Sequence, residues 1–330
     1  MTYVLPLPAR HATGPRLAGG WCRFDHVAML DRGAEAQIVP AASVPDAALA
    51  PLCETRPPIA GVPCDRPSIM GILNVTPDSF SDGGRFLDPD AAKARADAMA
   101  AADILDIGGE STRPGAVEVE VEVEAERVLP VIAALDGRRI SIDTRKADVA
   151  TAALQAGARL VNDVSAMRFD PEMATTVART DAHICLMHST ETPATMQRAP
   201  RYDHVLFDVY DALADRIATA EAAGIPRARM VVDPGIGFGK MQSHNLTLLR
   251  NIALFHGLGV PILLGVSRKG FIGTLGHAPV AADRMPGTLA VTLAAVAQGV
   301  QMHRVHDVAE MAQGLALWRE TGEPNGPVWN

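Results

Sequence analysis

Polar residues of the kinds that bind ligands stand directly after a series of short apolar runs in this chain of 330 residues. Carboxylate and amide oxygens accept hydrogen bonds, whereas ammonium and guanidinium groups donate them. Buried together without partners, such groups cost several kcal/mol, so a polar ligand with alternating donors and acceptors would stabilise them. The buried set best suited to such a ligand is Asp143, Asn162, Asp233 and Lys269.

A second set combines positive charge with an amide. Arg304 and His306 alternate with Val305 in an apolar run near the C-terminus, so both polar side chains point to one face of a strand. This pair suits a phosphate or diphosphate, through charge-assisted hydrogen bonds. Asn74 follows the first apolar run, and its amide oxygen can bind the magnesium ion that usually accompanies a diphosphate. We therefore expect Mg²⁺ near Asn74.

The elements that must position these residues form a repeat. Eight apolar runs of strand length alternate with alanine-rich segments of helical length, which implies right-handed crossovers and a parallel sheet. Eight such units over roughly 260 residues predict a (β/α)8 barrel of the α/β class (a TIM barrel), in which the strand ends meet at one mouth. A doubly wound open sheet is the alternative, but its glycine-rich turn is missing after Leu73. The eight runs are 69–73, 104–107, 140–142, 160–161, 184–187, 230–232, 261–266 and 301–305. The segments expected to be helical are 91–102, 122–135, 146–156, 171–179, 204–223, 244–256, 285–299 and 307–319.

Each polar strand end is weak evidence by itself. An aspartate there is more often a helix N-cap than a catalyst, and Thr144 and Asp163 suit that role. A lone histidine such as His188 is also more often structural. Polar groups at all eight strand ends, directed to one mouth, are harder to explain by capping and favour a binding site.

Residues 1–66 lack the repeat and contain many prolines and glycines. They predict an N-terminal extension of unknown role, packed on a barrel of residues 67–330. A short strand pair is expected where 27–30 and 37–39 flank a turn at 31–33.

The composition indicates a cytoplasmic globular protein, with 48% hydrophobic and 21% charged residues. We expect no signal peptide and no membrane helix, because no apolar stretch is long enough. Four scattered cysteines without a C-x-x-C pair argue against a disulfide framework or a structural zinc site. The net charge of −8 disfavours nonspecific nucleic-acid binding, although a few placed cations can still bind a small anion.

Seven strings at the strand ends resemble the dihydropteroate synthase family of the bacterial folate pathway. The resemblance implies a magnesium-dependent transferase that condenses 6-hydroxymethyl-7,8-dihydropterin diphosphate with p-aminobenzoate, giving 7,8-dihydropteroate and pyrophosphate. In this family the diphosphate is thought to leave first, and the aniline nitrogen attacks a stabilised pterin cation. Family members are commonly homodimers through their last helices, and 289–300 is apolar enough to fit. The strings, in the family's order from residue 67 onward, are N-V-T-P-D-S-F-S-D-G-G, I-G-G-E-S-T-R-P-G-A, S-I-D-T, V-N-D-V, D-P-G-I-G-F-G-K, S-R-K and R-V-H-D-V.

The resemblance also assigns roles to individual positions. The residues implied to bind the pterin are Asp143, Asn162, Asp233 and Lys269. The implied diphosphate ligands are Thr112, Arg304 and His306. The residues implied near the p-aminobenzoate are Arg113, Phe238 and Ser267. Asn74 resembles a magnesium ligand and Asp82 a carboxylate near the metal and the developing cation. The residues expected to act in catalysis are Asp82, Lys269, Arg304 and His306.

Two departures from the family's pattern concern the loops. Gly270 follows S-R-K, where many members carry Ser or Arg that can help to hold the p-aminobenzoate carboxylate. The string after the fifth strand is H-S-T-E at 188–191, where the family often has H-M-Q-G. Two other functions stay open: a methyltetrahydrofolate-dependent methyltransferase, and a noncatalytic pterin-binding or structural barrel. The first loop and the Arg304–His306 pair favour the synthase over the methyltransferase, and the intact first and second loops favour it over a noncatalytic barrel.

Overall fold

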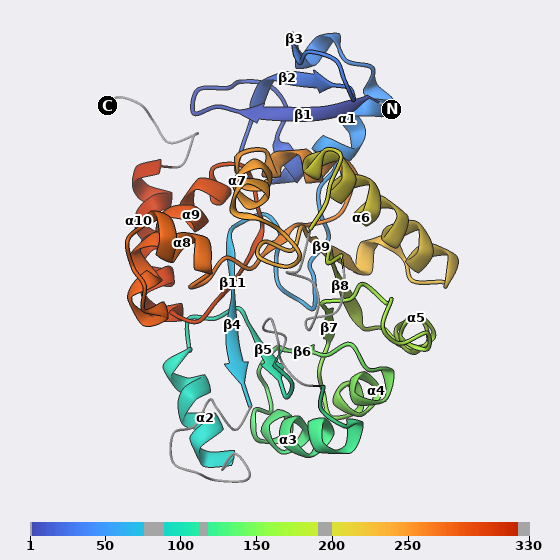
Figure 1. Cartoon of the computed structure of the whole chain (residues 1–330), viewed down its shortest axis with the longest axis vertical. Helices are drawn as coiled ribbons and strands as arrows, with labels where there is room; N and C mark the ends of the chain where they lie inside the picture. Colours follow the sequence, from blue (N-terminus) through green and yellow to red (C-terminus); the bar gives the residue numbers. More distant parts are fainter. Residues whose placement is uncertain (1, 76–88, 112–117, 191–199, 323–330) are drawn as a thin grey trace.

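The computed structural model describes residues 2–75, 89–111, 118–190 and 200–322. It contains a barrel and, beside it, a small antiparallel sheet (Figure 1). The barrel strands lie in the order β10-β11-β4-β5-β6-β7-β8-β9, and a parallel bridge between Val232 and Ile262 joins the two ends of this order. Each predicted apolar run overlaps one strand, which confirms the (β/α)8 barrel. The strands are β4 (Ser68–Asn74), β5 (Ile104–Gly108), β6 (Ile140–Asp143), β7 (Leu160–Asp163), β8 (His183–Met187), β9 (Met230–Asp233), β10 (Leu263–Leu264) and β11 (Met302–Val305).

Helices surround the strands and follow the predicted segments, with two differences. The predicted segment 244–256 is interrupted, because the α-helix ends at Arg250 and a 3-10 helix, η5 (Ile252–Leu258), follows. The six-residue α8 was not predicted, since G-F-I-G-T-L is short and contains two glycines. The outer helices are α2 (Pro89–Ala98), α3 (Val121–Ala134), α4 (Ala147–Gln155), α5 (Met173–Ala178), α6 (Val205–Ala222), α7 (Gln242–Arg250), α8 (Gly270–Leu275), α9 (Met285–Val296) and α10 (Val308–Gly322).

The barrel interior changes from apolar to polar along the strands. Its apolar part is a buried cluster that includes Met70, Ile104, Leu160, Cys185, Val231, Leu263 and Met302. Successive side chains of a strand point to opposite faces, so positions two residues further along face the interior again. The polar positions reached in this way are Asp106, Asn162, Asp233 and Arg304. The polar end is therefore the carboxyl end, where the site was predicted.

The apolar end of the barrel is closed by a tight hairpin. Ile59 and Val62 form an antiparallel bridge, and both side chains are fully buried. Together with Ala60 and Cys64 they belong to the same cluster as the inward apolar side chains of the strands. Residues 59–64 thus fill the bottom of the barrel.

The N-terminal sheet contains β1 (Tyr3–Pro8), β2 (Phe24–Leu30) and β3 (Gln37–Pro40), and α1 (Asp46–Cys53) follows it. The β2–β3 pair confirms the predicted strand pair, whereas β1 was not predicted because prolines interrupt Y-V-L-P-L-P. The Tyr3 ring stacks on Phe207 of α6, with 4.3 Å between the ring centroids. The Trp21 indole N–H donates to the Val296 carbonyl of α9 over 2.9 Å. The N-terminal extension therefore packs on two barrel helices, α6 through the sheet and α9 through Trp21.

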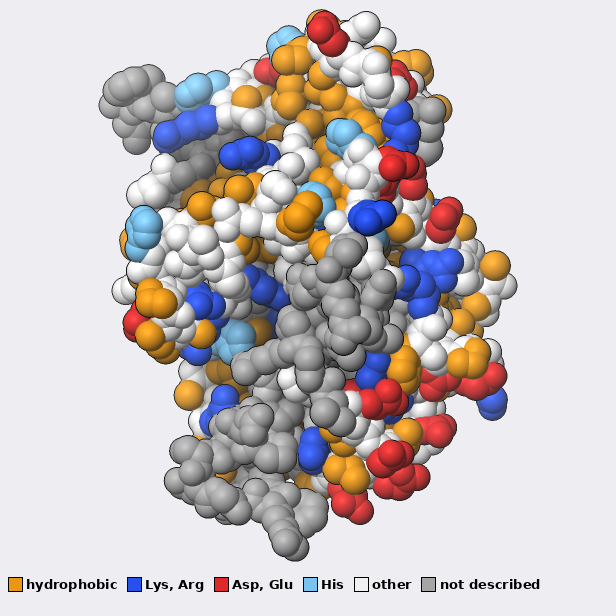
Figure 2. Space-filling model, in the orientation of Figure 1, with side chains coloured by type: hydrophobic (Ala, Val, Ile, Leu, Met, Phe, Trp, Pro, Cys, Tyr) orange, Lys and Arg blue, Asp and Glu red, His pale blue; other side chains and the backbone are white. Residues whose placement is uncertain are grey.

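The outer surface carries much of the charge. Figure 2 shows acidic side chains gathered over α3 and α4, at the lower right, while hydrophobic side chains gather over the N-terminal sheet at the top. Within the described ranges, we find no helix that is both long and apolar enough to span a membrane.

Candidate active site

Arg304 of β11 is the centre of the polar layer. Its Nε donates to Oδ2 of Asp106 over 2.6 Å, and one terminal nitrogen donates to Oδ2 of Asp143 over 2.7 Å. The Asp106 side chain is fully buried and that of Asp143 nearly so, while the Arg304 side chain is 20% exposed to solvent. Three strands, β5, β6 and β11, are thus joined at the mouth by one guanidinium.

Asn162 of β7 joins the same cluster, because its amide nitrogen donates to Oδ2 of Asp106 over 3.0 Å. The other carboxylate oxygens, Oδ1 of Asp106 and Oδ1 of Asp143, are buried and have no hydrogen-bond donor among the described residues. Burial raises the pKa of Asp143 to about 7, against the opposing effect of Arg304. Two acceptors are therefore left over for N–H groups of a ligand.

Asp233 and Lys269 form the other side of the mouth. Burial raises the pKa of Asp233 to about 6, although the Gly235 amide, which donates to Oδ1 over 2.7 Å, opposes this shift. Burial lowers the pKa of Lys269 to about 8, and the Asp233 carboxylate opposes that shift. The Lys269 side chain was predicted to be buried but is partly exposed, because it lies after the short β10 at the rim. The Phe238 ring covers its Nζ at 4.0 Å from the centroid.

The turn after β10 holds Lys269 and Ser267 in place. Arg268 has a φ of +58°, a left-handed conformation that needs support from its surroundings. Its amide donates to Thr288 of α9 over 3.0 Å, and its guanidinium forms a two-point ion pair with Asp307. Ser267 Oγ lies 3.0 Å from Nδ1 of His306, so the two neighbouring strand ends are linked directly.

Asn74 ends β4, between the strands that carry Arg304 and Gly108. A Cβ at Gly108 would lie 3.7 Å from the Asn74 Oδ1 and 3.4 Å from the Asp143 Cβ, so glycine leaves room beside both side chains. Among the described residues no group of three or more His, Cys, Asp or Glu side chains could hold a metal ion. A metal at Asn74 would therefore not be held by a cluster of such side chains in the described part of the chain.

The structure brings together most of the predicted site residues. Those that meet at the mouth are Asn74, Asp143, Asn162, Asp233, Phe238, Ser267, Lys269, Arg304 and His306. The predicted residues outside the described ranges are Asp82, Thr112 and Arg113. Their roles, like those of the residues at the mouth, stay predictions.

Other polar strand ends have structural partners. Asp163 accepts from the amides of Ser165 and Met167 at 2.7 and 2.6 Å, and Thr144 Oγ1 accepts from the Lys146 amide at 3.2 Å. Both side chains therefore stabilise turns. The prediction that they are helix N-caps was wrong, because the N-cap residues of α4 and α5 are Lys146 and Glu172. Gly270 is exposed, and a Cβ there would have no heavy atom within 4 Å.

Sequence reasoning missed Asp106. It stands inside the apolar run I-L-D-I rather than after it, so it did not belong to any strand end. The available signal was a lone carboxylate in an otherwise apolar strand, a placement that costs several kcal/mol without a partner. Arg304 and Asn162 are those partners.

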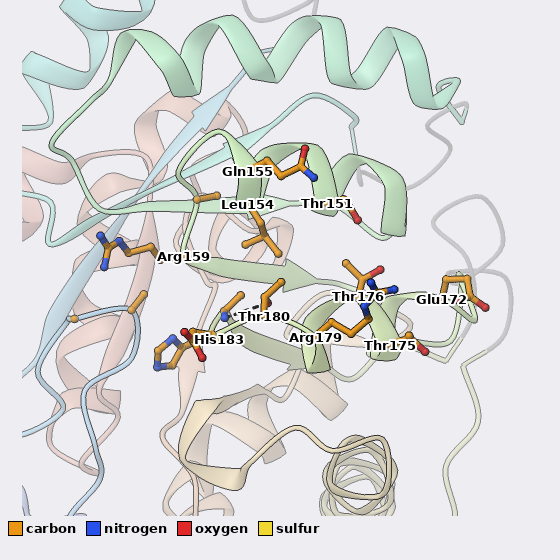
Figure 3. A pocket seen from close by; sticks show the side chains of 15 residues that line it. Thr151, Leu154, Gln155, Arg159, Glu172, Thr175, Thr176, Arg179, Thr180 and His183 are labelled. Atoms are coloured by element: carbon orange, nitrogen blue, oxygen red, sulfur yellow. Dashed lines mark hydrogen bonds between the residues drawn. The ribbon is translucent and has the colours of Figure 1, made fainter.

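A cavity of about 650 Å³ lies away from this chemistry, between α4 and α5 (Figure 3). Its lining includes Arg159 and His183, which stand at the beginnings of β7 and β8 rather than at their ends. None of the described residues that line it has a buried side-chain polar atom that lacks a hydrogen-bond partner. The cavity therefore has none of the orphan acceptors that distinguish the mouth.

Comparison with known proteins places this arrangement in context. A family described as pterin binding enzyme matches residues 70–306. Dihydropteroate synthase of Escherichia coli (strain K12) is 44% identical over 260 residues, which cover 77% of this chain and 92% of that protein. A crystal structure of Xanthomonas albilineans dihydropteroate synthase with 4-aminobenzoic acid is 43% identical, with a TM-score of 0.77 over 83% of this chain and all of that one.

A longer relative also matches. It is a probable bifunctional folylpolyglutamate synthase/dihydropteroate synthase of Haloferax volcanii, 46% identical over 265 residues. The match covers 79% of this chain but only 31% of that protein, so this chain spans about a third of it.

Proposed function

The chain belongs to the pterin-binding enzyme family, and from this premise we propose how its barrel mouth carries out the dihydropteroate synthase reaction. The chain is a transferase that condenses 6-hydroxymethyl-7,8-dihydropterin diphosphate with p-aminobenzoate, giving 7,8-dihydropteroate and pyrophosphate. The assignment of its residues to the steps of this reaction, its metal, its assembly and its location in the cell are proposals.

The observation that carries the assignment is the pair of orphan acceptors beside Arg304. Buried carboxylate oxygens normally have donors, and an unpaired one costs a desolvation penalty of about 1–3 kcal/mol or more. Oδ1 of Asp106 and Oδ1 of Asp143 lie in one polar layer, where a pterin could offer them its ring and amino N–H groups. The Lys269 ammonium would donate to a carbonyl or ring nitrogen of the same ligand.

The chemistry follows from where the charges lie. The C–O bond to the diphosphate breaks, and its electron pair leaves with the diphosphate toward Arg304 and His306. The amine of p-aminobenzoate then forms the C–N bond with its lone pair and releases a proton. Holding the partners in line and stabilising the charges that develop can supply most of the rate without a strong base. The partly exposed Phe238 and Lys269 lie at the rim, where the second substrate would enter.

The residues present fit a magnesium ion bound mainly by the substrate. Mg²⁺ usually binds through one or two protein oxygens together with substrate phosphates and water. Asn74 offers one amide oxygen at the strand end beside β11. A bound Mg²⁺ would neutralise charge on the leaving diphosphate, while Asn74 would hold it on the same side as Arg304.

A homodimer through α9 and α10 is supported by their surface. α9 reads M-P-G-T-L-A-V-T-L-A-A-V, yet its buried residues are only Thr288, Thr292, Ala295 and Val296. Leu317 on α10 is 62% exposed. Apolar surface of this kind favours association with a second copy. A cytoplasmic location is supported by the four cysteines, which are all free thiols.

The experiment that tests this function is pyrophosphate release with purified protein, the dihydropterin diphosphate, p-aminobenzoate and Mg²⁺, omitting each in turn. We expect release to need both substrates and Mg²⁺, and to match the dihydropteroate formed. Pterin binding without pyrophosphate release would instead favour a methyltransferase or a noncatalytic barrel. Full turnover after chelation of divalent ions would refute the magnesium proposal alone.

A further inference from the structure

Lys240, at the end of the loop after β9, is a buried lysine held almost entirely by the backbone. Its residue exposure is 3%, and its Nζ has no carboxylate within ion-pair distance among the described residues. Its neighbours are the carbonyl oxygens of Gly235 at 2.9 Å, Phe238 at 3.0 Å and His188 at 3.3 Å. The Nδ1 of His188 lies 2.9 Å away. An ammonium has three protons, so these four acceptors share them.

The loop from residue 234 to residue 240, which we term the β9 loop, folds around this nitrogen. Gly235, Gly237 and Gly239 have φ values of +68°, +82° and +60°, a conformation that glycine adopts without strain. A Cβ at Gly235 would lie 1.9 Å from the His188 carbonyl oxygen, so the loop backbone touches the segment after β8. Carbonyls turned inward by such a backbone need a donor, and Lys240 supplies it.

The same loop covers one side of Lys269. The Phe238 ring lies over Nζ of Lys269, and a Cβ at Gly237 would be 3.1 Å from its Cδ. The loop amides are also fixed: Phe238 donates to the Gly235 carbonyl over 3.1 Å, and Gly237 donates to Asn245 of α7 over 2.8 Å. The position of the Lys269 side chain therefore depends on the shape of the β9 loop.

We propose that Lys240 is a positioning residue of the synthase, which holds the β9 loop against Lys269 and joins it to His188. The catalytic interpretation rests on the function proposed above; the structural part does not. Burial lowers the pKa of Lys240 to about 7, which agrees with an ammonium that has no ion-pair partner to stabilise it.

The β9 loop touches groups that the proposed function assigns to both substrates. Its Phe238 ring lies over Lys269, and its Gly235 amide donates to Asp233. Loss of the Lys240 ammonium should therefore raise the KM for p-aminobenzoate, near Phe238, and the KM for the dihydropterin diphosphate, which Asp233 and Lys269 are proposed to bind. A residue that only stabilised the fold would lower the fraction of active enzyme and leave both KM values unchanged.

The variant for the test is Lys240→Met, which keeps the apolar stem and removes the ammonium. The matched control is Tyr202→Phe, which removes only neutral hydrogen bonds: the one from the Tyr202 hydroxyl to the Gly239 carbonyl of the same loop, over 2.8 Å, and the one with the Thr190 side chain. We expect Lys240→Met to raise the KM for p-aminobenzoate and the KM for the dihydropterin diphosphate by about tenfold or more each. Tyr202→Phe should leave both within about twofold.

Amide hydrogen exchange gives a readout that does not need turnover. In Lys240→Met, exchange at residues 235–240 should become faster, while α7 and the barrel strands keep their protection. If Lys240→Met does not fold, His188→Phe tests the link to the segment after β8, because it removes the ring nitrogens, Nδ1 among them, and keeps the His188 carbonyl. It should produce a smaller change of the same kind.

Unchanged KM values for both substrates, or unchanged exchange at residues 235–240, in folded Lys240→Met would overturn the proposal. So would wild-type exchange and kinetics in His188→Phe, should that variant be the one that folds. Absence of turnover in the wild-type protein would refute the proposed function instead. The exchange result would then still decide whether Lys240 holds the loop.

Discussion

Asp106 offers the sharpest test, because its two carboxylate oxygens have different tasks. Oδ2 accepts from Arg304 and Asn162 at 2.6 and 3.0 Å, whereas Oδ1 is buried without a donor among the described residues. Asp106→Ala removes both tasks. Asp106→Asn can keep its oxygen at the Oδ2 position and place an NH₂ group where the ligand-facing acceptor was. The two substitutions therefore separate stability from recognition.

The expected magnitudes follow from the partners. In Asp106→Ala the buried Arg304 loses one of its two carboxylates, and breaking a buried pair in this way costs about 3–5 kcal/mol. In Asp106→Asn both hydrogen bonds survive without the charge, so a loss of about 1–2 kcal/mol is expected. A donor facing the N–H groups of the pterin should weaken binding by on the order of 100-fold, which is about 2.7 kcal/mol.

Urea unfolding measures the first effect, and calorimetric titration with the dihydropterin diphosphate measures the second. Ser141→Ala is the matched control. Ser141 of β6 pairs in register with Asp106 of β5, and the buried Ser141 hydroxyl has no hydrogen-bond partner among the described residues. Removing that hydroxyl should leave stability and binding nearly unchanged. Wild-type affinity in Asp106→Asn would show that Oδ1 does not face the ligand. Wild-type stability in Asp106→Ala would refute the anchoring of Arg304.

Three further outcomes are expected. Acidification from about pH 8 to about pH 5 should weaken pterin binding, measured by calorimetry. The reason is that Asp143 and Asp233, with pKa values of about 7 and about 6, lose acceptor oxygens when they are protonated. Asp233→Asn should abolish the part of this pH dependence below about pH 6. Asn74→Ala should raise the Mg²⁺ concentration needed for half-maximal pyrophosphate release by about tenfold or more, yet leave the affinity for a pterin without diphosphate unchanged. Deletion of residues 1–54 should lower the melting temperature but leave activity at room temperature unchanged. Deletion of residues 1–60 should also remove Ile59, which is fully buried at the bottom of the barrel, and should therefore lower both stability and activity.

The fold could be predicted from the sequence because parallel strands of a barrel are buried on both faces. Such strands appear as short apolar runs, and each run from 69–73 to 301–305 became a strand. Elements without that signal were missed. β1 contains two prolines and pairs along one edge only, and α8 is too short to show a helical period. Both are defined by packing between distant parts of the chain.

The site could be predicted where a polar residue stands at the carboxyl end of its strand. Asn74, Asp143, Asn162 and Asp233 are the last or next-to-last residues of theirs. Asp106 was hidden because it stands inside an apolar run, two residues before the end of its strand. The role of Lys240 was hidden for another reason: its partners are backbone carbonyls, which every residue has, and only the folded loop brings them together.

The charges of the mouth explain why this arrangement suits a reaction that forms a cation. Three carboxylates, of Asp106, Asp143 and Asp233, face two cations, Arg304 and Lys269, so the polar layer has an excess of one negative charge when all are ionised. The raised pKa values of Asp143 and Asp233 show that burial disfavours their charged forms. A neutral pterin relieves this cost only through hydrogen bonds. In the function proposed above, a pterin that has lost its diphosphate would carry positive charge between these carboxylates and relieve this cost further, while Arg304 and His306 would stabilise the departing anion. Interactions that strengthen as the C–O bond breaks lower the barrier rather than only the binding energy.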